Sequence, residues 1–309
     1  MIKYSTLEGI NVPGTSIALG QFDGIHLGHQ AVINKAVEGR QRGLVPAVFT
    51  FTTGNSPATA PSKKVNNKFI FSQDLKLKAL DYLGVEVVFN PPFESFRGLT
   101  PEEFVRDIII GTFHAKEISC GFNFFFGKNA AASADDLTEM AAKYGVPVHK
   151  VEGVMWKDEP VSSTRIRKCL EEGDILSANS MLGLSFMLRN EVIPGKKLGR
   201  KIQFPTINQL FHPGQLIPRY GVYATYLEFG SRRYAGVTNI GVKPTVGSDM
   251  PLAETYIIGF EGDLYGTYPV LHLLEFLRPE MKFGSVEELR MAIANDVESS
   301  KAVFKKYFG

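Results

Sequence analysis

The sequence predicts two domains of different fold class, an α/β domain followed by an antiparallel β-barrel domain. In the first half, apolar runs typical of strands alternate with helical patterns, which indicates a doubly wound parallel sheet. From Gly221 onward, strand patterns follow one another without helices, and an amphipathic stretch at 286–306 closes the chain. The 309 residues suffice for about two separate cores. We place the domain boundary between 1–184 and 185–309, and expect a cut near Gly183 to give two folded pieces.

The composition indicates an ordinary soluble protein and argues against a nucleic-acid partner. Lys and Arg number 34 against 32 Asp and Glu, a net charge of +2, which is too balanced for a basic nucleic-acid surface. Only Cys120 and Cys169 are present, without C-x-x-C spacing, which fits a reduced cytoplasmic setting. The chain lacks signal-peptide features and any run near the ~18 apolar residues of a membrane span. We therefore expect a cytoplasmic protein without a membrane partner; the sequence does not predict its oligomeric state.

The elements of the first half follow from its apolar periodicity. Strands are expected at 16–19, 44–51, 85–89, 117–121 and 146–151, and helices at 30–40, 72–83 and 134–144. A further helix should start at Thr100, because Pro101 and Glu103 complete a capping box with it. The stretch 52–67 is rich in Thr, Ser, Asn, Pro and Lys and is expected to be a loop.

The stretch GQFDGIHLGHQ, residues 20–30, joins the first strand to the first helix. Ligands bind at such strand-to-helix turns in open α/β sheets, and the helix N-terminus suits phosphate. His26 and His29 can donate hydrogen bonds to phosphate oxygens there, and the glycines let the backbone approach closely. Two alternatives stay open from the spacing: Asp23, His26 and His29 as zinc ligands, or a tight turn with two surface histidines.

Two later stretches of the first half allow a structural and a functional interpretation. From its residues alone, the aromatic run 121–127, GFNFFFG, is predicted to be a core strand with glycine-marked ends, and a role in lining a ligand site is implied only by its resemblance to a family motif. In VSSTRIR, residues 161–167, Ser163 or Thr164 is a natural N-cap for a helix that extends to Glu172. The same hydroxyls, with helix N–H groups and the guanidinium of Arg167, could instead bind phosphate.

The second half contains a basic, glycine-spaced loop at 195–201 that leads to Phe204-Pro205-Thr206-Ile207-Asn208. The side-chain oxygens of Thr206 and Asn208 lie two residues apart, so an extended chain directs both to the same side, where they could be ligands of a hard cation beside a phosphate loop. The structural alternative is a proline-fixed turn with its lysines in solvent. Strands are expected at 222–228, 233–237, 240–245, 254–260 and 269–276. Strand alternation places Glu254 and Tyr256 on one face and Thr255 on the other.

These motifs, in this order and over essentially the whole chain, resemble those of the bacterial bifunctional riboflavin kinase/FMN adenylyltransferase (FAD synthetase) family. The resemblance implies an N-terminal nucleotidyltransferase domain of Rossmann-like fold and a C-terminal riboflavin kinase barrel with a C-terminal helix. It implies that the kinase phosphorylates the 5′-hydroxyl of riboflavin with ATP and Mg²⁺ to give FMN. The N-terminal domain would then adenylylate FMN with ATP, releasing FAD and pyrophosphate.

The resemblance also implies residue roles. ATP and phosphate in the adenylyltransferase would be bound by Gly20, Phe22, Asp23, Gly24, His26, Gly28, His29, Asn123, Ser163, Thr164 and Arg167. The kinase would bind ATP and Mg²⁺ through Gly195, Lys201, Thr206 and Asn208, the last two as metal ligands, use Glu254 as catalytic base, and place Arg278 near the flavin. Glu275 is the rival carboxylate.

The sequence departs from the family pattern at two positions. FTFTTGNSP stands where the family has a Phe-x-Pro-His-Pro-like motif, and Gln203 stands where glycine is common. The first departure motivates one alternative, a riboflavin kinase whose N-terminal domain only binds nucleotide. The other alternative is a different nucleotidyltransferase fused to a flavin-binding regulatory barrel.

Overall fold

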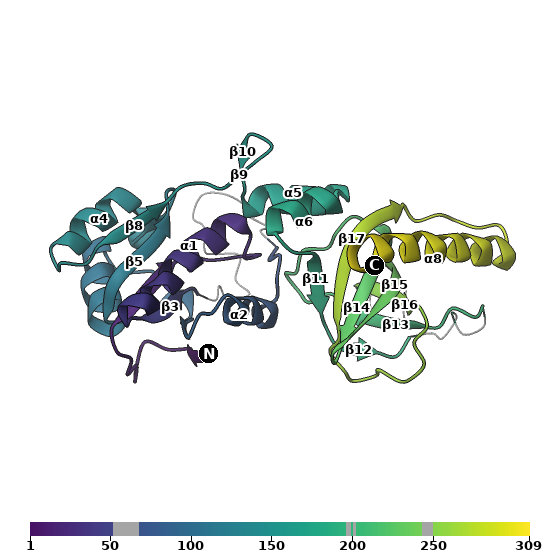
Figure 1. Ribbon diagram of the computed structural model, residues 1–309, viewed down its shortest axis with the longest axis horizontal. Helices are drawn as coiled ribbons and strands as arrows, with labels where there is room; N and C mark the ends of the chain where they lie inside the picture. Colours follow the sequence, from purple (N-terminus) through teal and green to yellow (C-terminus); the bar gives the residue numbers. More distant parts are fainter. Residues whose placement is uncertain (52–67, 196–198, 200–201, 243–249) are drawn as a thin grey trace. The chain divides into compact units, whose positions relative to one another are not determined.

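The structure is a computed structural model that describes residues 1–51, 68–195, 199, 202–242 and 250–309 (Figure 1). It consists of two compact units. The first combines Met1–Asn67 with Lys76–Ser162, and the second combines Lys68–Leu75 with Ser163–Gly309. Residues 163–184 therefore pack with the second unit. The boundary at 184/185, as the point where the two activities separate, stays a prediction.

The first unit contains the predicted parallel sheet. In its described residues the sheet has six strands in the order β1-β4-β3-β2-β5-β8, all parallel. The strands are β1 (Ile2–Tyr4), β2 (Thr15–Leu19), β3 (Val45–Phe49), β4 (Val87–Phe89), β5 (Ala115–Gly121) and β8 (Val148–Val151). Two short antiparallel pairs accompany it: β6 (Phe125–Phe126) with β7 (Ala132–Ser133), and β9 (Met155–Trp156) with β10 (Glu159–Pro160). The parallel α/β class is thereby confirmed.

Helices cover both faces of this sheet, as a doubly wound fold requires. The helical segments are α1 (Leu27–Val37), η1 (Glu38–Arg42), α2 (Gln73–Tyr82), η2 (Phe93–Ser95), α3 (Pro101–Glu103), η3 (Phe104–Thr112), η4 (Lys128–Ala130) and α4 (Ala134–Ala142). Along β2, Ile17 and Leu19 join the core cluster that contains residues of η3 and α4. Ala18 between them joins the cluster that contains residues of α1 and α2. Because successive side chains of a strand point to opposite faces, β2 contributes to two hydrophobic cores, one on each face of the sheet.

The predicted capping box is present: Thr100 accepts the Glu103 N–H, and Glu103 accepts the Thr100 N–H. The first helix begins at Leu27, three residues before the predicted start, because His26 caps it. The prediction missed β1, the short pairs and the π-helical geometry of η3. The predicted loop at 52–67 lies outside the described residues.

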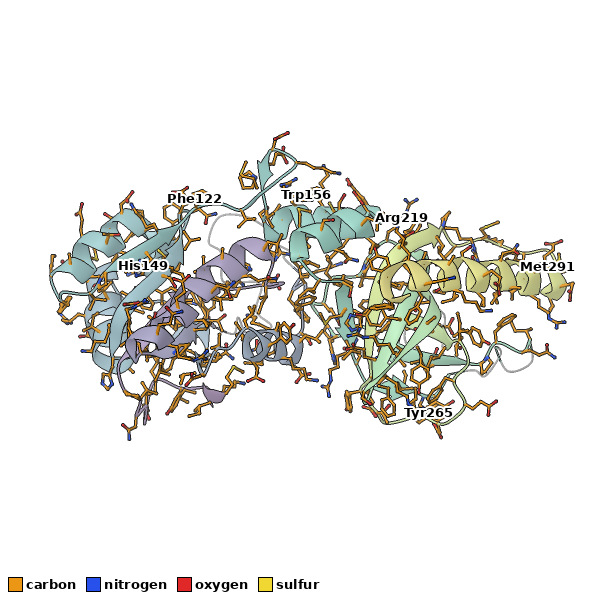
Figure 2. The ribbon with its side chains drawn as sticks, in the orientation of Figure 1. Phe122, His149, Trp156, Arg219, Tyr265 and Met291 are labelled. Atoms are coloured by element: carbon orange, nitrogen blue, oxygen red, sulfur yellow. The ribbon has the colours of Figure 1, made fainter. Side chains whose placement is uncertain are left out.

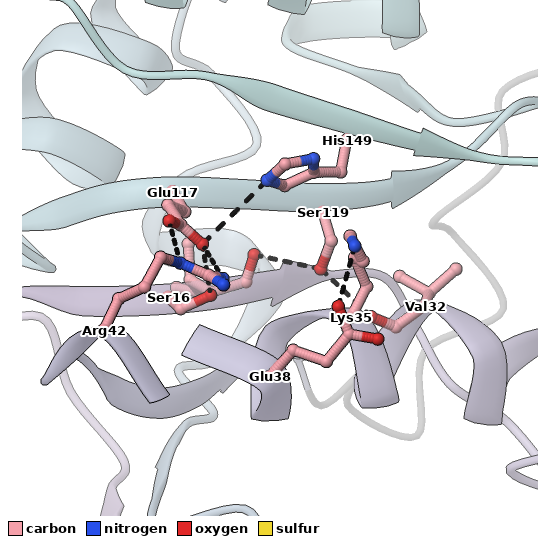
Figure 3. Close-up of polar contacts among 9 residues, drawn as sticks. Ser16, Val32, Lys35, Glu38, Arg42, Glu117, Ser119 and His149 are labelled. Carbon is pink, nitrogen blue, oxygen red and sulfur yellow. Dashed lines mark hydrogen bonds and ion pairs between the residues drawn. The ribbon is translucent and has the colours of Figure 1, made fainter. Parts of the chain in front are cut away.

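An ion-pair cluster joins three strands of the first unit near their amino ends (Figure 3). The carboxylate of Glu117 on β5 accepts two hydrogen bonds of 2.5 Å from the Arg42 guanidinium of η1. Ser16 of β2 also donates to Glu117 at 3.5 Å, and His149 of β8 lies 3.9 Å from the same carboxylate. The Arg42 guanidinium holds the pKa of Glu117 below its usual value. Because ligands bind at the carboxyl ends of parallel strands, we regard this cluster as structural.

The second unit contains the predicted antiparallel sheet. In the described residues it has seven strands in the order β11-β17-β14-β15-β16-β13-β12. The strands are β11 (Phe186–Arg189), β12 (Val192–Ile193), β13 (Thr206–Leu210), β14 (Gly221–Phe229), β15 (Arg232–Val242), β16 (Pro251–Ile257) and β17 (Val270–Arg278). The order runs from β11 to β12, so the predicted barrel takes the form of a half-barrel. A two-residue turn at Gly230 and Ser231 joins β14 to β15, as predicted.

Among the described residues of this unit, the helices are α5 (Ser163–Glu172), α6 (Ile175–Leu182) and α8 (Val286–Phe308). No element was predicted from the sequence at 175–189, where the structure has α6 and β11. Met181 and Leu182 of α6 are fully buried, and Phe186 already belongs to β11. An apolar helix of eight residues flanked by polar positions is too short to give a clear periodic signal.

The two faces of the sheet differ in what they contact. On one face, the hydroxyls of Thr225, Thr238 and Thr255 form a buried hydrogen-bonded chain with steps of 2.9 and 2.8 Å. On the other face, Val222, Val237 and Tyr256 cluster with Ile293 and Val297 of α8. Glu254 therefore lies on the face that α8 packs against, as its alternation with Thr255 predicted.

Candidate active sites

The turn after β2 is strongly bent and closely packed. Phe22 and Ile25 adopt positive φ values of 52° and 42°, a conformation that non-glycine residues adopt rarely. Gly24 has a φ of 81°. The Phe22 ring folds back over Gly20 so closely that a Cβ on Gly20 would lie 2.9 Å from it. Two residues with strained backbone thus lie at the strand end where ligands of such sheets bind.

The two histidines of this turn lie against each other at the start of α1. Nδ1 of His26 accepts the backbone N–H of His29 at 3.3 Å, which makes His26 the N-cap of the helix. The two rings stack with centroids 3.5 Å apart, and the Phe22 ring meets His29 edge-on at 5.3 Å. Because Nδ1 of a neutral His26 is an acceptor, its proton lies on Nε2. Both imidazoles thus lie at a helix N-terminus, where an anion is favoured.

Gly28 lies between the two histidines in sequence, and its surroundings leave little room for a side chain. A Cβ there would lie 3.2 Å from the His26 ring and 3.8 Å from the Val161 carbonyl oxygen. Within the described part of the chain, no group of three or more His, Cys, Asp or Glu residues is arranged to hold a metal ion. This geometry favours the phosphate interpretation of the turn over the zinc interpretation.

The aromatic run 121–127 follows β5, which is the parallel neighbour of β2. Asn123 is exposed just beyond the end of β5, so it shares the strand-end edge with the histidine turn. Phe122 and Phe125 are 49% and 61% exposed, and Figure 2 labels Phe122. Only Phe126 is buried among the apolar core residues. The core-strand interpretation is therefore wrong for most of the run, and exposed aromatic rings are available to a flat ligand.

Ser163, Thr164 and Arg167 lie on α5 and belong to the second unit. The helix begins at Ser163, so the N-cap position falls on Ser162, one residue earlier than predicted. Nε of Arg167 donates to the Lys68 carbonyl oxygen at 2.9 Å. The part of these residues in binding phosphate stays a prediction.

In the second unit, strand register aligns the residues expected in the kinase site. Asn208 of β13 lies directly opposite Glu254 of β16, and Glu254 lies directly opposite Asn239 of β15. The same row continues through Val222 of β14 to Arg278 of β17, and we call its members Asn208, Glu254, Asn239 and Arg278 the polar row. Residues that are directly opposite in antiparallel strands share one face of the sheet. Three predicted site residues from three separate sequence motifs therefore lie in one row.

The amide of Asn208 fits against a glycine. A Cβ on Gly195 would collide with the side-chain amide of Asn208, so any larger residue here would require that amide to move. Thr206 lies two residues before Asn208 on β13 and faces the same side. Lys201, the basic residue expected beside them, lies outside the described residues.

The two remaining predicted residues have partners on α8. The Arg278 guanidinium binds Asp296 with three contacts of 2.7 to 3.2 Å. Glu275 pairs with Lys306 at 3.0 Å. These pairs attach α8 to β17, and Arg278 keeps its place in the polar row.

Two polar residues near these sites were not selected from the sequence. Asn239 lies half-buried in the polar row, and its Nδ2 donates a hydrogen bond to Glu280 at 3.3 Å. A polar residue alternating with apolar ones on a strand was the available signal. Lys76 of α2 is only 6% exposed beside the histidine turn, and no local pattern distinguishes it from the exposed Lys78.

Fold and sites together define a class, a two-domain transferase that uses a nucleotide in each domain. A parallel α/β sheet with a histidine turn at a helix N-terminus is followed by an antiparallel half-barrel with a carboxylate, two amides and a guanidinium in one row. The FAD synthetase family model matches residues 10–165, and the riboflavin kinase family model matches residues 182–304.

Relatives match over almost the full chain. The bifunctional riboflavin kinase/FMN adenylyltransferase of Listeria monocytogenes is 34% identical over 294 residues, which cover 94% of this chain and 92% of the relative. The Escherichia coli enzyme of the same name is 31% identical, with 94% and 93% covered. A crystal structure described as a macrolide-efflux protein from Streptococcus pneumoniae superposes with a TM-score of 0.85 at 29% identity, covering 97% of this chain and 98% of that one.

The chain belongs to the bifunctional riboflavin kinase/FMN adenylyltransferase family. It makes FMN from riboflavin and FAD from FMN, with ATP as co-substrate. Its partners are therefore small-molecule substrates. Among the helices that the structure describes, none has the length and apolar character that crossing a membrane requires.

Proposed function

We propose that the polar row of the second unit is the site of riboflavin phosphorylation. In this reaction the 5′-hydroxyl oxygen of riboflavin attacks the γ-phosphorus of ATP, ADP leaves, and the hydroxyl proton must be accepted. Glu254 is the base in this proposal because it lies between Asn208 and Asn239 on the face opposite the buried threonines. The register that joins Asn208 to Glu254 is the observation that carries the proposal, since it brings two separate motifs together.

We propose Mg²⁺ as the metal of this reaction. Thr206 and Asn208 offer a hydroxyl and an amide oxygen from one side of β13, and Gly195 fixes the amide. Oxygen donors of this kind suit Mg²⁺, which takes few protein ligands and completes its shell with phosphate and water. When bound, the ion would neutralise charge on the transferring phosphoryl group. The protein side chains themselves position the nucleotide and accept the proton.

For FAD formation, we propose that the histidine turn of the first unit binds the phosphates of ATP. A phosphate oxygen of FMN attacks the α-phosphorus, and pyrophosphate leaves. Because the attacking group is already an anion, no base is needed, and positioning with charge stabilisation suffices. The stacked imidazoles and the N-terminus of α1 supply hydrogen-bond donors for this purpose. Asn123, Ser163, Thr164 and Arg167 are proposed as further contacts.

The test separates flavins after incubation with riboflavin, ATP and Mg²⁺. Wild-type protein should form FMN and then FAD. The His29→Ala variant should form FMN at nearly the wild-type rate and essentially no FAD. His149→Ala is the matched control, because His149 lies on β8 in the Glu117 cluster near the amino ends of the strands, away from the histidine turn at their carboxyl ends. This variant should form both products. Loss of FMN formation in folded His29→Ala protein would contradict the assignment of sites to units.

We also propose a cytoplasmic location. Both cysteines, Cys120 and Cys169, are free, as expected for a protein in a reducing compartment. Cell fractionation with detection of the chain tests this, and recovery from a secreted fraction would contradict it.

A further inference from the structure

Lys76 is a buried lysine next to the histidine turn. It lies on α2, is 6% exposed, and belongs to the first unit together with the turn. Lysine is almost never fully buried unless its charge is paired, because burying an ammonium group is costly. A buried lysine at a strand-end ligand site therefore calls for a functional explanation.

The Lys76 ammonium joins the ends of two neighbouring strands. Nζ donates to the Gln21 carbonyl oxygen at 2.9 Å and to Oγ1 of Thr50 at 3.3 Å. Thr50 in turn donates to the same Gln21 oxygen at 2.9 Å. Gln21 and Thr50 follow the paired residues Leu19 and Phe49 at the ends of β2 and β3. The three groups thus close a triangle immediately before the bent segment of the turn.

Asp23 is an acidic neighbour of the Lys76 ammonium. Burial lowers the pKa of Lys76 to about 8, and the negative charge of Asp23 partly offsets this effect. Asp23 is itself buried within the turn. The lysine therefore holds the turn at two points, by hydrogen bonds to its first residue and by attraction to Asp23.

We propose that Lys76 is a positioning residue of FAD synthesis, whose ammonium group holds the Gln21–His26 turn in the shape that presents both imidazoles to the ATP phosphates. The strained residues Phe22 and Ile25 explain why such a clamp is needed, since a conformation of this kind persists only when its surroundings enforce it. This inference rests on the proposed phosphate role of His26 and His29.

The experiment measures both activities in the full-length protein. Lys76→Met removes the charge at nearly constant shape, Lys76→Arg keeps it, and Lys78→Met is the matched control on the exposed side of α2. For Lys76→Met we expect kcat/KM for ATP in FAD synthesis to fall about 10- to 100-fold, the size of one lost charged hydrogen bond. Lys76→Arg should recover most of this loss. Riboflavin kinase activity, which also consumes ATP, should stay within about twofold in every variant.

Thr50→Val provides a second, independent variant in case Lys76→Met does not fold. It removes only the shared hydroxyl and should lower kcat/KM for ATP in FAD synthesis in the same direction, with recovery in Thr50→Ser. In wild-type protein, FAD synthesis should also decline as the pH rises through about 8, because the ammonium loses its proton; kinase activity at the same pH is the reference. In Lys76→Arg the decline should move to higher pH.

The outcomes separate this inference from the function on which it rests. If His29→Ala abolishes FAD synthesis while Lys76→Met and Thr50→Val behave like Lys78→Met, the positioning role is wrong and the phosphate site stands. If His29→Ala retains FAD synthesis, the phosphate site itself is wrong. If Lys76→Arg fails to recover activity in folded protein that has the same melting temperature as wild type, the charge is not the decisive property.

Discussion

Two carboxylates lie on strands of the second sheet, and they differ in their partners. Glu254 lies between Asn208 and Asn239 in the polar row. Glu275 lies on β17, three strands from β16 in the sheet order, and binds Lys306 of α8. Glu275 is held by a lysine of a packed helix, whereas Glu254 lies directly opposite two asparagines in the row of predicted kinase-site residues. This position in the row favours Glu254 as the group that receives a proton from a substrate.

Glu254→Gln should therefore lower kcat for FMN formation by about 10²- to 10⁴-fold, the usual contribution of a positioned base. The amide keeps shape and hydrogen bonding, so riboflavin binding should change little, and FMN-to-FAD conversion should be preserved. Steady-state kinetics with separated flavins measure both. Glu275→Gln is the matched control and should keep near wild-type kcat; the reverse pattern would transfer the role of base to Glu275.

Gln203 shows how this chain accommodates a departure from the family. It has a φ of 68°, in the left-handed region that glycine adopts without strain. Its side-chain oxygen accepts a 2.8 Å hydrogen bond from Arg290 of α8. This bond ties the segment before Phe204-Pro205-Thr206 to the helix, and so compensates for the unfavourable backbone conformation.

Arg290→Ala should consequently raise the KM for ATP of the kinase severalfold in the wild-type background but not in Gln203→Gly. A double-mutant cycle on kinase kinetics isolates this coupling. Gln203→Gly alone should be close to neutral, because relief of about 1 kcal/mol of strain offsets the lost bond. Strictly additive effects of the two substitutions would show that the contact does not hold the loop.

Single residues also show which features of the candidate sites could be predicted from the sequence. Glu254 and Asn208 were identified through their motifs, and alternation gave the correct face for Glu254. Their direct opposition depends on the register between β13 and β16, which no local pattern encodes. Lys76 was missed for the same reason, because its burial depends on how α2 packs against the ends of β2 and β3.

At the scale of elements, the cluster around Glu117 makes the amino-terminal edge of the first sheet sensitive to acid. The pKa of Glu117 is lowered, mainly by the hydrogen bond from Arg42 and further by nearby positive charge. A carboxylate with a lowered pKa stabilises the fold above its unfolded-state pKa of about 4.5, and this contribution is lost as the pH falls through the folded-state value. The contact between β5 and η1 should weaken accordingly (Figure 3).

Glu117→Gln should unfold the first unit at a lower denaturant concentration than wild type at pH 7, and the difference should shrink and then vanish as the pH falls below 4.5 through the lowered folded-state pKa of Glu117. Trp156 is the single tryptophan and lies in this unit, so its fluorescence follows the transition. Glu38→Gln is the control, because Glu38 pairs with Lys35 at the exposed surface, where ion pairs contribute little. A pH-independent difference for Glu117→Gln would show that packing, not charge, is responsible.

Element prediction succeeded where periodicity was long and failed where it was short. The alternating pattern of the first half identified the parallel sheet, and the cap at Thr100 was correct in detail. Strands of two or three residues, such as β1, β6 and β9, gave no period to detect. The α6 helix was overlooked because its eight residues are too few to show a clear helical period before β11 begins.

At the scale of the whole molecule, the compact units and the matched families divide the chain differently. The riboflavin kinase family model begins at 182, close to the predicted boundary. The compact second unit begins at Ser163 and also includes Lys68–Leu75. Strands β2, β3, β4, β5 and β8 could be assigned from sequence. The membership of α5 and α6 in the second unit could not, because it depends on long-range packing.

Contacts within the second unit explain why α5 and α6 belong to it. Asn179 of α6 donates to the Leu273 carbonyl oxygen of β17 at 2.9 Å and accepts the Phe186 N–H of β11 at 2.7 Å. Arg219 donates its backbone N–H to Leu170 of α5 at 2.9 Å. Met181 is fully buried. Removing the two helices would leave these groups and the apolar surface under them exposed.

We therefore expect a fragment 163–309 to fold and phosphorylate riboflavin, and a fragment 184–309 to do so with lower stability. Losing several buried apolar side chains costs about 3 kcal/mol or more, which lowers the melting temperature of a unit of this size by roughly 10 °C. Both fragments lack Lys68–Leu75, so their comparison isolates α5 and α6. Thermal unfolding and FMN formation at 25 °C measure the difference. Equal melting temperatures would mean that the kinase core begins at the predicted boundary, whereas an unfolded 184–309 beside a folded 163–309 would make α5 and α6 indispensable to it.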